Sequence, residues 1–103
     1  MPDSPSELSS GISVIVKIVP VPGREEKLRE RMEFVANLSR AEQGCLRYEL
    51  FADRSGLPDF YFLAEWVDQE SLDAHNQTRH VNDFGKDRSI LAKEMTLTFL
   101  RRV

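Results

Sequence analysis

The chain has two histidines, and both lie in its second half within a short distance of each other. His75 follows Leu72 by three residues, so a helix would place both side chains on one face. An imidazole with an ordinary pKa of about 6.5 can accept a proton from a phenol or an enol at neutral pH. His75 is therefore a candidate general base, and a half-buried structural histidine is the competing interpretation.

The spacing of His75 and His80 does not favour a metal held along one helix. Histidines that share a metal in this way lie four residues apart, whereas these two lie five apart. Cys45 is the only cysteine, which excludes an internal disulfide and a cysteine cluster, and no carboxylate stands at an obvious ligand spacing. We expect no metal site, and we interpret His80 as a helix-start residue or a hydrogen-bond donor in a pocket wall.

The segments around these residues predict the elements that must position them. Alternating or β-branched residues predict four strands, at 12–19, 45–51, 60–67 and 95–100. Apolar residues at steps of three and four predict a helix from 24 to about 44 and a second helical stretch at 81–93, which Gly85 weakens. Asp68 is a good N-cap for a short helix that ends near Asn76. Leu46, Tyr48 and Leu50 should share one face of the second strand.

The element order β-α-β-β-α-β predicts an α+β fold of the ferredoxin-like, split β-α-β kind. In this fold an antiparallel four-stranded sheet carries its helices on one face. Both faces of the expected strands are largely apolar, so the face without helices needs a cover. A second copy of the chain is the simplest cover, and we expect a homodimer.

The composition is that of one small globular domain. The 103 residues are 41% hydrophobic and 30% charged, with a formal net charge of -3 and no basic stripe for nucleic acid. Residues 1–11 are rich in serine and proline and suit a flexible N-terminal arm, which leaves 12–103 as the domain. The start lacks the pattern of a signal peptide and no apolar run is long enough to span a bilayer, so we expect a cytoplasmic protein without membrane contact.

Two stretches resemble the antibiotic biosynthesis monooxygenase family. Residues 64–75, followed by His80, are similar to its E-x-W, L-x-x-H and second-histidine pattern, and residues 44–48 are similar to the entry of its second strand. The resemblance implies two sheets packed into a dimeric α+β barrel, with an apolar pocket in each subunit. It also implies that His75 and Trp66 are catalytic, and that Tyr48, Phe62 and His80 contact the substrate.

The same resemblance implies an oxygenase that needs no metal, haem or flavin and acts on phenolic or quinol-like aromatics. No cofactor-binding motif occurs in the sequence, so a redox substrate would itself supply the electrons to oxygen. Where many members read T-P-H, this chain has Thr78-Arg79-His80, and the cation Arg79 suits a phosphate. An isomerase of a hydroxyketone or sugar phosphate is therefore an alternative, and a dimeric binding protein without catalysis is another.

Overall fold

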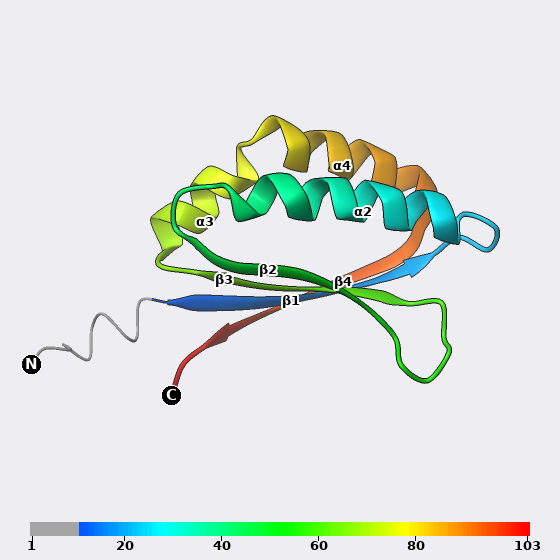
Figure 1. Ribbon diagram of the computed structural model, residues 1–103, viewed down its shortest axis with the longest axis horizontal. Helices are drawn as coiled ribbons and strands as arrows, with labels where there is room; N and C mark the ends of the chain where they lie inside the picture. Colours follow the sequence, from blue (N-terminus) through cyan, green and yellow to red (C-terminus); the bar gives the residue numbers. More distant parts are fainter. Residues whose placement is uncertain (1–10) are drawn as a thin grey trace, which may run out of the picture.

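The four strands form one antiparallel sheet in the order β2-β3-β1-β4 (Figure 1). The computed structural model describes residues 11–103, so the expected N-terminal arm lies outside the described residues apart from Gly11. The strands are β1 (Ile12–Pro20), β2 (Cys45–Ala52), β3 (Phe60–Trp66) and β4 (Ala92–Arg101). The predicted α+β class and the order of its elements are confirmed.

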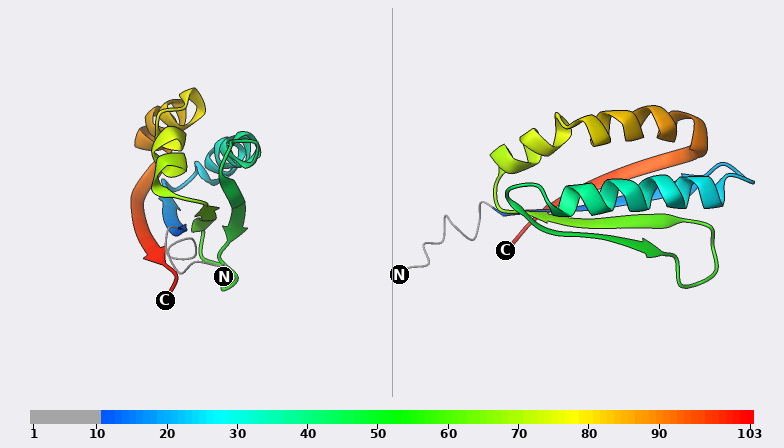
Figure 2. Two further views of the ribbon diagram at one scale, coloured as in Figure 1. Left: turned by 90° about the vertical axis from the view of Figure 1, so that its left-hand side faces the viewer. Right: turned by 45° about the horizontal axis from the view of Figure 1, so that its top comes forward.

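In the described part of the chain, residues 11–103, three helices lie on one face of this sheet, as the two further views also show (Figure 2). They are α2 (Glu25–Arg40), α3 (Gln69–Asn76) and α4 (Arg79–Leu91). The Asp68 carboxylate accepts the Ser71 N–H at 2.8 Å and begins α3 as predicted. Thr78 caps α4 in the same way, so that helix begins two residues before the predicted position. Within residues 11–103, no helix is both long enough and apolar enough to cross a membrane.

The C-terminal strand is longer than its alternating sequence predicts. β4 begins at Ala92, although the helical pattern continues to Lys93. The Val21 N–H donates to the Leu91 carbonyl at 2.8 Å, and Pro20 lies opposite Ala92 across β1 and β4. Pairing with the central strand β1 therefore ends the helix earlier than its local periodicity indicates.

A bulge in β2 overturns the predicted face of Leu46. Cys45 lies opposite Trp66 and Arg47 lies opposite Glu65, so Leu46 is the extra residue between them. Its side chain is 64% exposed, whereas Cys45 packs against the core. The alternation of apolar residues cannot reveal such an insertion, because one extra residue reverses the face of every residue before it.

The core lies between the helices and the inner face of the sheet. Strand residues such as Val14, Phe62 and Trp66 meet Leu28 and Met32 of α2 there, and all five are buried. The burial of this layer fixes α2 along the sheet, and with α2 the loop that follows it.

The outer face of the sheet is a mixture of apolar and charged side chains. Ile15 lies opposite Leu63 at its centre, and Phe51 is 45% exposed. Arg47 forms ion pairs with Glu49 at 2.8 Å and with Glu65 at 3.8 Å. The outer face is therefore less uniformly apolar than the sequence indicates.

Candidate active site

A cavity of about 230 Å³ lies between the inner face of the sheet and the helices α3 and α4. Most of the residues that line the cavity are apolar, among them Phe62, Trp66 and Phe84. An apolar cavity of roughly 150 Å³ holds a benzene ring. The volume here therefore suits one substituted aromatic ring. A fused three-ring polyketide needs considerably more space.

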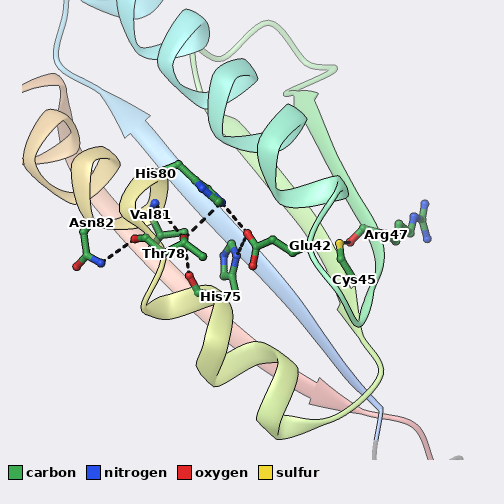
Figure 3. Close-up of polar contacts among 8 residues, drawn as sticks. All are labelled: Glu42, Cys45, Arg47, His75, Thr78, His80, Val81 and Asn82. Atoms are coloured by element: carbon green, nitrogen blue, oxygen red, sulfur yellow. Dashed lines mark hydrogen bonds and ion pairs between the residues drawn. The ribbon is translucent and has the colours of Figure 1, made fainter.

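One ring nitrogen of His75 contacts a carboxylate, and the other has no hydrogen-bond partner among residues 11–103. Nδ1 lies 2.9 Å from Glu42 Oε2 (Figure 3). An ionised carboxylate can only accept, so Nδ1 carries the hydrogen and Nε2 has the lone pair. Within residues 11–103, Nε2 has no hydrogen-bond partner, and Ser39 Oγ is the only unpartnered side-chain polar atom sealed from solvent. His75 is one of the residues that line the cavity, which makes it the candidate base for a molecule bound there.

The same carboxylate oxygen binds the second histidine. His80 Nε2 lies 2.6 Å from Glu42 Oε2, so one oxygen accepts hydrogen bonds from both imidazoles. The Thr78 hydroxyl donates to the His75 carbonyl at 2.7 Å, which ties the end of α3 to the start of α4. Figure 3 shows the two imidazoles approaching Glu42 from these helices. Glu42 is therefore held from two sides and restrains the ring of His75.

A glycine allows the loop of Glu42 to approach α3. Gly44 has φ +85°, a conformation that L side chains rarely adopt. A Cβ atom there would lie 2.0 Å from Ser71 Oγ, in the first turn of α3. The Gly44 carbonyl also accepts the Val67 N–H at 2.9 Å. The close contact brings the turn after α2 against the helix that carries His75.

Aromatic side chains surround the imidazole of His75. Its centroid lies 4.6 Å from that of Trp66 and 5.5 Å from that of Tyr48. Tyr48 in turn lies 5.0 Å from Phe62, and all three aromatic residues are buried. The structure thus brings together four of the residues that the sequence singled out, His75, Trp66, Tyr48 and Phe62, and all four line the cavity.

Burial controls the protonation of the site. It lowers the pKa of His75, and this effect outweighs the neighbouring Glu42 carboxylate, which raises it. His75 is therefore neutral at pH 7, as a general base must be. Burial also raises the pKa of Tyr48, so its hydroxyl stays protonated and remains a hydrogen-bond donor.

The model of the family described as "Antibiotic biosynthesis monooxygenase" matches residues 11–87. The chain belongs to the antibiotic biosynthesis monooxygenase family. A relative of similar sequence is "Putative monooxygenase YcnE" of Bacillus subtilis (strain 168), which is 34% identical over 73 residues, or 71% of this chain and 75% of that protein. The family resemblance of the sequence is confirmed.

Solved structures of antibiotic biosynthesis monooxygenases and related proteins share the fold. PA3566 from Pseudomonas aeruginosa is 31% identical and superposes with a TM-score of 0.87 over 93% of this chain and 97% of that chain. A crystal structure described as an antibiotic biosynthesis monooxygenase is 26% identical, with a TM-score of 0.82 over 89% of this chain and 98% of that chain. These likenesses establish the family and the fold, and a monooxygenase reaction is consistent with them.

Two predicted residues lie away from the cavity wall. His80 is in the first turn of α4, as predicted, but it is not among the residues that line the cavity, and its Nε2 is on Glu42. The role of His80 as a substrate contact stays a prediction. The side chain of Arg79 is 94% exposed and its Nε lies 3.4 Å from Asp83, so it does not serve the cavity.

The sequence did not point to Glu42. It lies 33 residues before His75 and 38 before His80, beyond any local spacing. With it, the three side chains offer metal-binding donor atoms within 4.8 Å of one another, contrary to our inference that no carboxylate completes such a set. In the structure the two imidazole nitrogens are hydrogen-bonded to the same oxygen of Glu42, so the three side chains form a carboxylate shared by two imidazoles.

Proposed function

We propose that this protein is a cofactor-independent monooxygenase that oxidises a small, electron-rich aromatic, such as a hydroquinone, with molecular oxygen. The observation that carries the proposal is the buried, neutral His75, which lines an apolar cavity and whose Nδ1–H is held by Glu42, so that the lone pair is on Nε2. Membership of the monooxygenase family supports the reaction class. The size of the cavity supports a single ring.

The first step is the removal of a proton from a substrate hydroxyl by His75 Nε2. Glu42 stabilises the imidazolium that forms, because its carboxylate already accepts the Nδ1–H. The aromatic anion is left among Trp66 and Phe62, away from bulk water. An anion in such surroundings is a stronger electron donor than the neutral quinol.

The second step transfers electrons to oxygen without a cofactor. The anion gives one electron to O₂, and the two radicals combine to form a C–O bond at a ring carbon. The O–O bond then breaks, one oxygen stays on the ring, and the other leaves as water with two hydrogens from the substrate. A hydroquinone and O₂ thus give a hydroxyquinone and H₂O. Tyr48 lines the cavity and its hydroxyl stays protonated, so we propose it as the donor to the negative charge as it moves.

Oxygen uptake tests this proposal directly. Untagged protein, freed of metal and flavin, should consume oxygen with at least one member of a panel of hydroquinones. The substitution His75→Ala should lower kcat/KM by about 10²–10⁴-fold, because it removes the general base. Gln77→Ala, at an exposed position after α3, is the control and should leave the rate unchanged. Absence of turnover with every hydroquinone, or full activity of His75→Ala, would contradict the proposal.

The isomerase alternative loses its strongest argument in the structure. Arg79 was its candidate phosphate ligand, and its side chain is exposed and paired with Asp83. The alternative is tested by thermal melting with ligands. A sugar phosphate that raises Tm when hydroquinones do not would favour the isomerase, and a binding protein of another kind predicts that neither ligand has an effect.

We also propose that the protein acts as a homodimer. The edge strand β4 carries exposed apolar residues on both faces, with Leu97 at 44%, Phe99 at 58% and Leu100 at 44% exposure. Leu97 and Phe99 also line the cavity. A second copy over β4 and the outer face would bury these side chains and separate the cavity from water.

A further inference from the structure

One face of helix α4 forms a continuous part of the cavity wall. Val81, Phe84, Gly85 and Arg88 stand at helical steps of three, four and seven residues, and all four line the cavity. Two of them, Gly85 and Arg88, have no role in the chemistry described above. Their types and surroundings indicate what the cavity is built to hold.

Gly85 has no structural reason to be a glycine. Its φ is not positive, unlike that of Gly23, Gly44 and Gly56, and a Cβ atom at this position would meet nothing within 4 Å. Glycine in a helix interior is destabilising relative to alanine. Gly85 therefore lowers the stability of α4, and what its missing side chain leaves is an empty space that forms part of the cavity.

Arg88 brings a positive charge to the same wall. Its side chain is half-buried, and within residues 11–103 it has neither an ion pair nor a hydrogen bond. The neighbouring acid, Asp87, forms an ion pair with Arg31, in which Arg31 Nε lies 2.7 Å from Asp87 Oδ2. Among the described residues that line the cavity, none is acidic. A cation beside an apolar cavity without a protein partner is complementary to an anionic ligand.

We propose that this wall of α4 is a subsite for a carboxylate, so that the ligand is a hydroxylated aromatic acid. The ring occupies the space beside Gly85, the carboxylate meets the guanidinium of Arg88, and a ring hydroxyl faces His75. The planar fork of arginine can bind both carboxylate oxygens, which also fixes the orientation of the ring. The identification of this ligand as a substrate rests on the proposed function, whereas its binding does not.

Calorimetric titration with two matched probes tests the subsite. The probes are 2,5-dihydroxybenzoate and its methyl ester, which differ in the negative charge. The acid should bind the wild-type protein at least about ten-fold more tightly than the ester. Arg88→Gln should abolish this difference with little effect on the ester. Lys86→Gln removes the same charge from an exposed position of α4 outside the cavity wall, and it should leave the difference intact.

The space beside Gly85 has its own test. Gly85→Ala should raise Tm and weaken the binding of both probes, because the new methyl group stabilises the helix and occupies the cavity. Ser89→Ala, at an exposed position of the same helix, is the control and should not change the binding. A variant that binds both probes as tightly as the wild-type protein would show that the space is not used.

The outcomes separate the subsite from the reaction. Equal affinity for acid and ester, or a preference that survives Arg88→Gln, would overturn the carboxylate subsite. Binding of glucose 6-phosphate that depends on Arg88, with no binding of dihydroxybenzoate, would also overturn it. Arg88-dependent binding of the acid without any oxygen uptake would uphold the subsite and count against the monooxygenase.

Discussion

Replacement of Glu42 by glutamine separates the roles of shape and charge at the site. The side chain keeps its size but loses the charge that accepts hydrogen bonds from His75 at 2.9 Å and from His80 at 2.6 Å. Hydrogen bonds to a charged group contribute about 1.5–3 kcal/mol each, and neutral ones about 0.5–1.5 kcal/mol. Both hydrogen bonds go to the same oxygen, Oε2, so the amide oxygen of glutamine can accept the same two bonds as weaker, neutral ones. We expect Glu42→Gln to lower the free energy of unfolding by about 1–3 kcal/mol, measured by urea titration.

The same substitution should move the pH dependence of activity. Burial lowers the pKa of His75, and the Glu42 carboxylate opposes that effect. Without the carboxylate the pKa of His75 falls further, so the acidic limb of kcat/KM should move to lower pH. The plateau of kcat/KM should also fall, because the imidazolium is less stabilised and the ring less restrained. This fall should not exceed the whole contribution of a general base, about 10²–10⁴-fold.

The sign of the effect on stability follows from the same shift. The pKa of His75 is lower in the folded state, so the unfolded chain takes up the proton first as the pH falls below about 6.5. Folding stability from this residue is therefore present above that pH and lost below it, and the loss should be larger in Glu42→Gln. Glu33→Gln, on the exposed side of α2, is the control for a lost charge. An acidic limb that stays in place or moves to higher pH would refute the role assigned to Glu42.

Three further measurements test the packing of the core, the independence of the reaction from metal ions and the assembly. Trp66→Ala should lower the free energy of unfolding by about 3–5 kcal/mol, because the indole is 1% exposed, and Trp66→Phe should cost less in the same urea titration. Removal of divalent ions with EDTA, followed by dialysis, should leave oxygen uptake unchanged, because Glu42 and both histidines are already hydrogen-bonded to one another. Activity that returns only with an added ion would show that these three residues form a metal site. Sedimentation equilibrium at low micromolar concentration should give about twice the chain mass of 11.9 kDa, and a folded monomer would contradict the proposed dimer.

The sequence by itself determined the class of fold and the position of the aromatic half of the site. Hydrophobic periodicity reports which residues share a face of one element, and that suffices to identify four strands and the helices between them. Trp66 and His75 lie on adjacent elements joined by a cap at Asp68, so their proximity follows from short-range structure. The family pattern spans the same short segment, which explains why the family could be identified from it.

Only the tertiary structure decided which groups complete the site. Glu42 meets His75 and His80 because α2 packs along the sheet and Gly44 admits its loop against α3, and no local spacing records such a contact. The bulge at Leu46 and the start of β4 at Ala92 depend on pairing with another strand. The free space at Gly85 and the position of Arg88 on the cavity wall become visible only when the sheet lies opposite α4. Each of these features is set by long-range packing, which the periodicity of a single segment does not contain.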